Sequence, residues 1–333
     1  MKENITERRK LALIAMVLLM VGAIAVMNGK KSEEETSALH IGSLKGPTSM
    51  GLLYLMEESE EGKAENAYHF TMATTADELL PLMVKGELDI ALVPANVASI
   101  LYNKTEGGIT VIDVNTLGVL YMVSGDTALQ SISDLKGKTI YLTGRGTTPD
   151  YVLQYLLKEN GLSAEDCALE YKSEATEVAA LLAENPDAIG LLPQPFVTAA
   201  CAQNEKLNIV LDMTAEWDKV QGESGSRMVT GVTVVRNQIL EDNEKAVKTF
   251  LAEHAESTAA INDNPEAGAK LVVEAGIVAK EPIAQKAIPY CYIVSITGTE
   301  MQQSVSAYLQ VLYEQSPDSV GGSLPGEDFY YCE

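Results

Sequence analysis

The sequence predicts an α/β protein with two lobes of similar plan and a ligand cleft between them. From about Leu39 onward, strand-like and helix-like segments alternate, which is typical of sheets with parallel strands. Residues 40–56 and 138–157 share one pattern of strand, glycine turn and helix. Residues 88–100 and 187–199 share a second pattern, a buried strand that ends in proline where a helix begins. Matched order and spacing indicate two related lobes.

The spacing of these patterns places two strand-to-helix junctions in each lobe. The interval from Gly46 to Pro94 is 48 positions, and the interval from Gly146 to Pro193 is 47. In open α/β sheets, ligands bind beyond the carboxyl ends of the strands. The sequence therefore predicts a ligand held between the four junctions.

The junction at residues 138–157 carries the clearest local signals. Gly144 and Gly146 allow a sharp turn, Thr148 is expected as N-cap, Pro149 as the first helical residue, and Asp150 complements the helix dipole. Backbone N–H groups at such a helix start form a site for an anionic or carbonyl-bearing ligand. An ordinary, well-capped turn is the alternative.

The first lobe is expected from residue 39 to 120 and from 232 to 333. Its expected strands are residues 40–44, 68–73, 88–93 and 111–114, and its expected helices are 49–57, 76–84, 96–102, 244–262, 265–275 and 300–313. Residues 321–331 are expected as a loop whose terminal aromatics pin the C-terminus onto the first lobe.

The second lobe is expected from residue 121 to 231. Its expected strands are residues 139–143, 169–172, 188–192 and 208–212, and its expected helices begin at 149, 175 and 196. Residues 117–123 and 228–236 are long β runs that are expected to cross between the lobes. Two crossing strands form a hinge of the kind used for closure around a ligand.

The N-terminus predicts export. Lys2, Arg8, Arg9 and Lys10 precede an apolar run at residues 11–27, so residues 1–31 are expected to be a signal or membrane anchor and residues 32–38 a polar linker. The run is at the short limit for a membrane span. We expect an extracytoplasmic protein tethered to the cell membrane by this segment, or secreted if the segment is cleaved.

The charge balance excludes some partners. The formal net charge is −23, whereas nucleic-acid binding needs basic patches. Four cysteines, Cys167, Cys201, Cys291 and Cys332, match no zinc spacing. The pairs Cys167/Cys201 and Cys291/Cys332 would each stay within one lobe, and disulfides and free thiols both remain open.

Enzyme chemistry is not visible in the sequence. The three histidines have no partner at ligand spacing, and His254 is expected on a polar helix. No nucleophile elbow, phosphate loop or dinucleotide fingerprint is present. We expect no catalytic residues, no metal and no cofactor.

The candidate ligand-binding residues are the polar and glycine residues of the junctions, together with one tyrosine on a crossing strand. They are Gly46, Thr48, Ser49, Asn96, Tyr121, Arg145, Gly146, Thr147, Thr148 and Gln194. Each also has an ordinary interpretation: a helix cap for the hydroxyls, core packing for Tyr121 and a solvated turn for Arg145. Trp217, the only tryptophan, is expected in the core.

Several of these segments resemble the substrate-binding proteins of ABC importers, in the branch that includes nitrate, sulfonate, taurine and thiamine-pyrimidine-precursor binders. They are residues 46–51, 93–97, 134–138, 144–149 and 192–196. The resemblance implies a type II periplasmic-binding-protein fold, an extracytoplasmic location, and a membrane permease and ATPase as partners of a monomer.

Two departures from the resemblance concern anchoring and the ligand. A lipobox cysteine is absent, and Gln194 stands where many relatives have an acidic residue. The resemblance predicts delivery of a small organic or anionic solute to an importer. The alternative is a membrane-tethered ligand-sensing or scaffold module without its own transporter.

Overall fold

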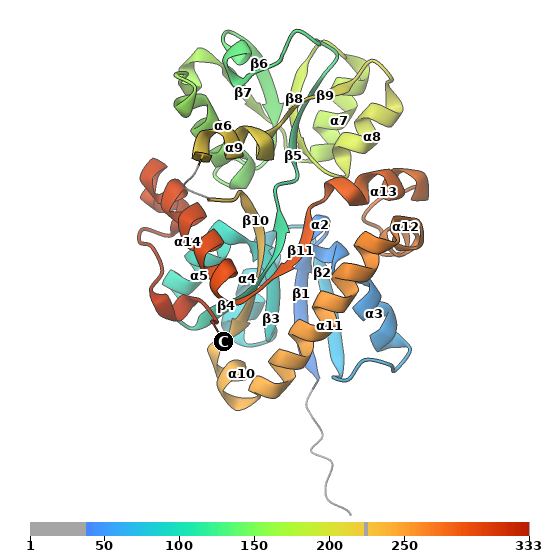
Figure 1. The fold of residues 1–333 in the computed structure, drawn as a ribbon, viewed down its shortest axis with the longest axis vertical. Coiled ribbons are helices and arrows are strands. Elements are labelled where there is room, and N and C mark those ends of the chain that lie inside the picture. The colour runs from blue at the N-terminus through green and yellow to red at the C-terminus, as the bar shows by residue number, and fades with distance from the viewer. Residues whose placement is uncertain (1–37, 223–225, 333) are drawn as a thin grey trace, which may run out of the picture. The chain divides into compact units, whose positions relative to one another are not determined.

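Two mixed β-sheets with interleaved helices form the computed structural model, which describes residues 38–222 and 226–332 (Figure 1). The six-stranded sheet has the order β11-β4-β10-β3-β1-β2 and the five-stranded sheet the order β7-β6-β8-β5-β9. The N-terminal segment predicted at residues 1–31 lies outside the described residues. The predicted lobe boundaries stay a prediction.

The six-stranded sheet combines segments from both ends of the chain. Its strands are β1 (Leu39–Leu44), β2 (Tyr68–Ala73), β3 (Ile90–Pro94), β4 (Ile109–Leu117), β10 (Val229–Arg236) and β11 (Ile293–Ile296). The helical segments associated with this part of the chain are α2 (Pro47–Met50), α3 (Leu53–Glu60), α4 (Ala76–Lys85), α5 (Ala95–Lys104), α10 (Asn237–Asp242), α11 (Glu244–Asp263), α12 (Pro265–Glu274), α13 (Glu281–Ala287), η4 (Ile288–Tyr290), α14 (Gly298–Gln315), η5 (Pro317–Val320) and η6 (Glu327–Phe329).

The five-stranded sheet comes from the middle of the chain. Its strands are β5 (Leu120–Ser124), β6 (Thr139–Leu142), β7 (Ala168–Tyr171), β8 (Ile189–Pro193) and β9 (Asn208–Asp212). The helical segments here are η1 (Ile132–Leu135), α6 (Thr148–Glu159), η2 (Ala164–Asp166), α7 (Ala175–Glu184), α8 (Phe196–Gln203) and α9 (Met213–Gln221).

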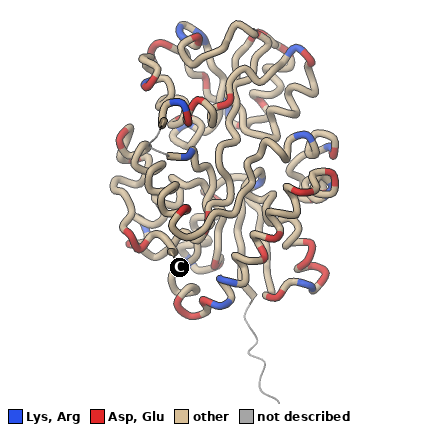
Figure 2. The backbone as a smooth tube through the Cα atoms, in the orientation of Figure 1, with Lys and Arg blue, Asp and Glu red and all other residues tan. Residues whose placement is uncertain are grey.

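Apolar residues on both faces explain why the central strands are sandwiched between helices. On β3, Ile90 and Leu92 pack in one cluster with residues of α3 and α11, while Ala91 and Val93 pack in another with residues of α4 and α5. Alternate residues of a strand point to opposite faces, so a continuous apolar run needs cover on both sides. Figure 2 shows most charged residues on the outer helices and loops.

The main buried cluster includes residues of both sheets. It joins Val93 and Val111 of the six-stranded sheet to Met122 and Ile140 of the five-stranded sheet. Helix α14 contacts both β4 and α6, which explains how this cluster stays continuous. The contact between α14 and α6 becomes important for the candidate site.

Several predicted elements needed correction. The helix expected at residues 49–57 is interrupted at Gly51 and Leu52, and the run at 117–123 is broken at Gly118 and Val119 into the end of β4 and the start of β5. Helices α9, α10 and α13 and strand β11 were not predicted. His254, expected on a polar helix, is fully buried, and its Nδ1 lies 2.8 Å from Asp113 Oδ2.

The C-terminal aromatics pin the chain end, as predicted. Phe329 is fully buried with its ring centroid 5.0 Å from that of Tyr102, and the Tyr331 N–H donates to the Val111 carbonyl. The four cysteines are free thiols, so neither of the two pairs considered from the sequence is bridged.

An ion pair joins three neighbouring strands of the six-stranded sheet, at the ends of these strands that lie away from the junctions. Arg236 Nη2 lies 2.7 Å from Asp89 Oδ1, and the side chains are only 19% and 12% exposed. The other Asp89 oxygen accepts the His40 N–H at 2.9 Å, and Arg236 Nε donates to the Leu88 carbonyl. Residues of β1, β10 and the segment leading into β3 therefore share one polar contact.

We expect Asp89→Ala to lower the free energy of unfolding by about 2–4 kcal/mol, because it leaves a half-buried guanidinium and a strand N–H without their acceptor. Glu170→Ala is the control: Lys172 Nζ lies 3.7 Å from Glu170 Oε2 in a pair whose side chains are 30% and 53% exposed. Such exposed pairs contribute about 0–1 kcal/mol. Urea unfolding measures both, and equal losses in the two variants would contradict the prediction.

Candidate ligand-binding site

Parallel pairing brings the four predicted junctions together in two pairs, each at the carboxyl ends of two neighbouring strands. β1 pairs in parallel with β3, and β6 pairs in parallel with β8. The junctions β1–α2 and β3–α5 therefore lie beside one another, and so do β6–α6 and β8–α8. The two junctions of each pair are neighbours because of the topology alone, since adjacent parallel strands have their carboxyl ends on the same side of the sheet.

At the β1–α2 junction, two hydroxyl groups bond back to the end of the strand. Thr48 Oγ1 donates to the Leu44 carbonyl at 2.8 Å, and Ser49 Oγ donates to the same carbonyl at 2.6 Å. Ser49 Oγ is also 2.7 Å from Ser43 Oγ. Gly46 has φ 147°, a value that strongly favours glycine. With their protons committed, the Thr48 and Ser49 oxygens can only accept further hydrogen bonds.

The same junction touches the crossing strand β10. A Cβ added at Gly231 would lie 2.8 Å from the Thr48 methyl group and 2.4 Å from Asn115 Oδ1. Only a glycine lets β10 pass this close to both side chains. Thr48 therefore lies where the β1–α2 junction meets β4 and β10.

At the β6–α6 junction, the helix start is one residue earlier than predicted. Thr147 is the N-cap and Thr148 the first helical residue, so Pro149 is the second. Thr147 Oγ1 donates to the Gly144 carbonyl at 2.6 Å. The Thr147 hydroxyl therefore supports the turn, while the Thr148 side chain is left for another contact.

A carboxylate of the helix itself occupies the N-terminus of α6. Asp150 Oδ2 accepts the Gly146 N–H at 2.7 Å, and Asp150 Oδ1 accepts from Gln154 Nε2 at 2.5 Å and from Tyr171 Oη at 2.6 Å. Asp150 is 4% exposed. The Gly146 N–H group of this turn therefore already binds a carboxylate, that of Asp150.

Arg145 points away from the neighbouring junction. It is exposed, and its guanidinium carbon lies 4.2 Å from the ring centroid of Tyr171 on the edge strand β7. Burial and the Asp150 carboxylate raise the pKa of Tyr171, whereas Arg145 lowers it. The structure thus gives Arg145 a cation–π contact at the sheet edge.

Thr148 faces a residue that the sequence did not indicate. Its hydroxyl lies beside that of Tyr308 on α14, near enough to act as a hydrogen-bond partner of the phenol, although neither buried oxygen makes a hydrogen bond of regular geometry within the described residues. Burial raises the pKa of Tyr308. The Tyr308 ring centroid is 5.4 Å from that of Trp217, and Trp217 is 4.8 Å from Tyr155.

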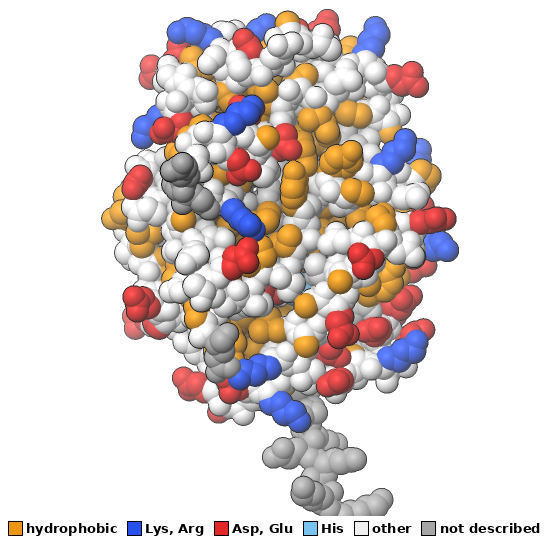
Figure 3. Space-filling view, viewed as in Figure 1, with side chains coloured by type: hydrophobic (Ala, Val, Ile, Leu, Met, Phe, Trp, Pro, Cys, Tyr) orange, Lys and Arg blue, Asp and Glu red, His pale blue; other side chains and the backbone are white. Residues whose placement is uncertain are grey.

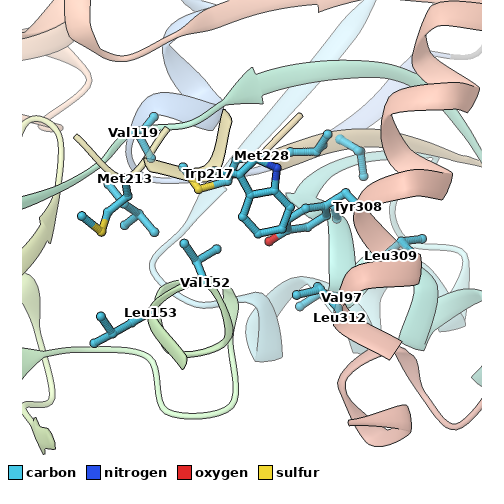
Figure 4. Packing of buried hydrophobic residues seen from close by; sticks show 14 of the residues in the cluster. Val97, Val119, Val152, Leu153, Met213, Trp217, Met228, Tyr308, Leu309 and Leu312 are labelled. Carbon is cyan, nitrogen blue, oxygen red and sulfur yellow. The ribbon is translucent and has the colours of Figure 1, made fainter. Parts of the chain in front are cut away.

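The Trp217–Tyr308 contact joins helices of the two sheets. Figure 4 shows the two rings side by side, with Val152 of α6 on one side and Leu312 of α14 nearby. Trp217 is fully buried, as predicted, and its Nε1 donates to the Ser226 carbonyl at 2.9 Å. Tyr308 was missed because its spacing from Met301, at helical period, is that of an ordinary core residue.

Asn96, at the β3–α5 junction, lies against the turn that follows α14. Its Nδ2 donates to the Ser319 carbonyl at 3.3 Å, which fixes the orientation of the amide and leaves Oδ1 buried and unpartnered. Asn96 is 1% exposed. Other unpartnered buried side-chain atoms on α14 and η5 are Tyr308 Oη, Gln315 Nε2 and Ser319 Oγ. A buried unpaired polar group costs about 1–3 kcal/mol, and one explanation is a bound molecule or water.

Gln194 and Tyr121 lie beside the first crossing segment. Gln194 N–H donates to the Val119 carbonyl at 3.0 Å, and Gln194 Oε1 accepts from the backbone and hydroxyl of Thr198. Tyr121 is 2% exposed and donates to the Tyr290 carbonyl at 3.0 Å. Burial raises the pKa of Tyr121. Tyr121 thus links β5 to the segment before β11.

An exposed aromatic surface surrounds this link. Tyr290 is 52% exposed and Tyr292 is 36% exposed. Tyr292 Oη is 3.5 Å from Asp212 Oδ2, at the end of β9. Figure 3 shows hydrophobic side chains gathered near the middle of the face that is turned to the viewer.

The ten candidate residues therefore divide by position. Gly46, Gly146 and Thr147 shape turns, and Arg145 stacks at a sheet edge. Thr48 and Ser49 lie at the β1–α2 junction, Tyr121 and Gln194 beside Val119, and Asn96 and Thr148 near α14. Asp150 and Tyr308 are the residues whose importance was not predicted.

Two surface grooves lie elsewhere, along α11. One has a volume of about 640 Å³ and includes Glu58, Lys248 and Glu253, and the other, of about 380 Å³, includes Ala255 and Tyr331. Within residues 38–222 and 226–332, no three His, Cys, Asp or Glu side chains are placed to share a metal ion. In this part of the chain, no helix has the length and hydrophobicity needed to cross a membrane.

A family model matches most of the folded part of the chain. The model is described as "ABC transporter, phosphonate, periplasmic substrate-binding protein" and matches residues 53–286. A binding protein of Brucella abortus is 25% identical over 166 residues, which are 50% of this chain and 49% of that protein. The chain thus spans about half the length of the curated relatives it matches.

Solved structures share the fold over nearly their whole length. An ABC transporter protein from Parabacteroides distasonis is 24% identical with a TM-score of 0.74, over 89% of this chain and 99% of that one. The periplasmic aliphatic sulphonate binding protein SsuA from Escherichia coli is 16% identical with a TM-score of 0.70, over 88% of this chain and 92% of that one. The predicted fold class is therefore confirmed.

We expect Tyr308→Phe to leave the free energy of unfolding within about 1 kcal/mol of the parent, because the hydroxyl it removes makes no hydrogen bond of regular geometry. Tyr308→Ala should cost about 3–5 kcal/mol, because it removes a buried ring. Emission of Trp217, the only tryptophan, reports the contact directly during denaturant unfolding. The emission maximum should shift to longer wavelength in Tyr308→Ala alone.

A loss above about 2 kcal/mol in Tyr308→Phe would show that the hydroxyl makes a stabilising hydrogen bond. Tyr313→Ala, in which a half-buried ring of the same helix is removed, is the control for effects on α14 itself. Its tryptophan emission should match the parent.

Proposed function

Because the chain belongs to the family of periplasmic substrate-binding proteins of ABC transporters, we propose that it binds a small solute outside the cytoplasm and delivers it to an ABC importer. Its partners are then a membrane permease and the associated ATPase. The family description favours this function over a tethered sensing module without a transporter. The family consists of transport proteins, which also argues against an enzyme.

The solute site proposed here lies between the strand-to-helix junctions and α14. The observation that carries this is a set of buried polar atoms on these elements that make no hydrogen bond of regular geometry: Asn96 Oδ1, Thr148 Oγ1 and Tyr308 Oη. They come from the β3–α5 junction, the β6–α6 junction and α14. A solute bound among them would replace the missing hydrogen bonds.

We assign contacts to the solute to Thr48, Ser49, Asn96, Thr148 and Gln194, with Tyr308 added. Gly46, Gly146 and Thr147 hold the turns in place, and Tyr121 holds β5 against the Tyr290 carbonyl.

Release and capture of the solute require the two sheets to move apart. The crossing segments at residues 117–120 and 226–229 connect the sheets and are the natural hinge. The Trp217–Tyr308 contact would break on opening and form again on closure. Burial of two rings then favours the closed arrangement.

A thermal-shift screen over sulfonates, nitrate, bicarbonate, pyrimidines, sugars and aromatic acids tests the proposed function. A solute at 100 times its dissociation constant should add about 2.7 kcal/mol to the free energy of unfolding. For the solute that binds, Thr148→Val should weaken affinity about tenfold, because it removes one hydrogen bond in a buried site. Isothermal titration calorimetry measures the affinity.

Thr176→Val is the matched control, because Thr176 is an exposed threonine in the first turn of α7. Its affinity for the solute should equal that of the parent. If Thr148→Val binds as tightly as the parent, Thr148 does not contact the solute. If no compound stabilises the protein, the binding function itself is in doubt.

The location rests on residues 1–31, which we propose form an uncleaved membrane anchor or a cleaved signal. Residues 38–333 form one compact unit by themselves. We therefore expect a chain of residues 32–333 to be soluble and folded, with the circular dichroism spectrum of an α/β protein. Aggregation or loss of secondary structure would show that the N-terminal segment belongs to the folded core.

A further inference from the structure

We infer that the solute donates hydrogen bonds and carries no formal negative charge where it meets the junctions. This inference rests on the proposed function and specifies the chemistry of that same site. It runs against the sulfonates and phosphonates that the names of relatives suggest. Three features of the described residues lead to it.

The first feature is the amide of Asn96. Its Nδ2 donates to the Ser319 carbonyl, which cannot itself donate, so the amide orientation is fixed and Oδ1 points elsewhere. A carbonyl oxygen only accepts hydrogen bonds. An ionised sulfonate or a phosphonate dianion has no proton to offer to it. An N–H or O–H group of the solute would satisfy this buried oxygen.

The second feature is the direction of the hydrogen bonds that the two hydroxyl groups of the β1–α2 junction make. Thr48 and Ser49 both donate to the Leu44 carbonyl, so their oxygens face any further partner as acceptors. Together with Asn96 Oδ1, the junctions of the six-stranded sheet present acceptors. An anion would gain a hydrogen bond from either hydroxyl only at the expense of that hydroxyl's bond to the Leu44 carbonyl.

The third feature is the charge around the N-terminus of α6. Buried Asp150 takes the Gly146 N–H in the turn that leads into α6. An anionic solute would meet a like charge in a poorly solvated place, which is costly. The polar atoms left unpartnered there and on α14, those of Thr148 and Tyr308, are uncharged.

The cations beside the junctions are engaged elsewhere. Arg145 stacks on Tyr171, and Arg227 Nη1 lies 3.2 Å from Glu300 Oε1. Neither of these two is free to offer the charge-assisted hydrogen bonds that a bound sulfonate or phosphonate would need in place of its water. The geometry therefore fits a neutral or cationic solute such as an amide, an amine or a polyol.

Matched pairs of compounds that differ by one acidic group test this inference on the full chain. The pairs are nicotinamide and nicotinate, glucose and glucuronate, and cytidine and cytidine 5′-monophosphate, with methylphosphonate, ethanesulfonate and inorganic phosphate as free anions. We expect stabilisation in the thermal-shift assay by an uncharged member and at least about tenfold weaker binding of its acidic partner. The three free anions should give no saturable shift.

The ionic strength of the buffer gives a second readout. Affinity for the uncharged compound should change less than about twofold between 20 and 500 mM NaCl, because no net charge is screened. Saturable binding of an anion that weakens with salt and is lost in Thr148→Val would overturn the inference and leave the proposed function standing. Failure of every compound to bind would contradict both.

Discussion

The parallel pairing of β1 with β3 and of β6 with β8 is the constraint on which the candidate site depends. The two strands of each pair have their carboxyl ends side by side, and each strand leads directly into a helix. Two helix starts therefore lie next to one another in each sheet without any long loop. Helix α14 then contacts α5 on one side and α6 on the other. The β3–α5 and β6–α6 junctions, from distant parts of the sequence, are thereby placed beside the same helix.

Much of this arrangement was readable from sequence, because it depends on periodicity. Strands β2 and β9 begin and end where the apolar pattern predicts, and the helix starts at Ala76 and Ala175 were also correct. The missed elements, α9, α10, α13 and β11, are short or lack a continuous apolar run. Their positions are decided by tertiary contacts, such as that of α13 with α8, which no local pattern records.

The site was less predictable, because side chains compete for the same backbone groups. Asp150 was correctly expected to complement the helix dipole, yet by occupying the Gly146 N–H it also removes the anion site that the turn predicted. Arg145 has an aromatic partner on a neighbouring strand, and Tyr308 comes from a helix about 160 positions further along the sequence. Residue types alone cannot rank such partners.

The contact between Trp217 and Tyr308 balances two opposed contributions. Burial of the Trp217 and Tyr308 rings favours it, whereas the unpartnered oxygens of Asn96, Thr148 and Tyr308 oppose it by about 1–3 kcal/mol each.

The crossing segment is itself strained, because Val119 has φ 115°, a value that costs a β-branched residue about 1–3 kcal/mol. Its neighbour must be glycine, since a Cβ at Gly118 would lie 1.8 Å from Thr214 Oγ1. A solute that satisfies the three oxygens removes the largest opposing contribution and leaves the strain and the ring contact unchanged. On the proposed function, hydrogen bonding to the solute would therefore decide whether this contact forms, and burial of the two rings alone would not.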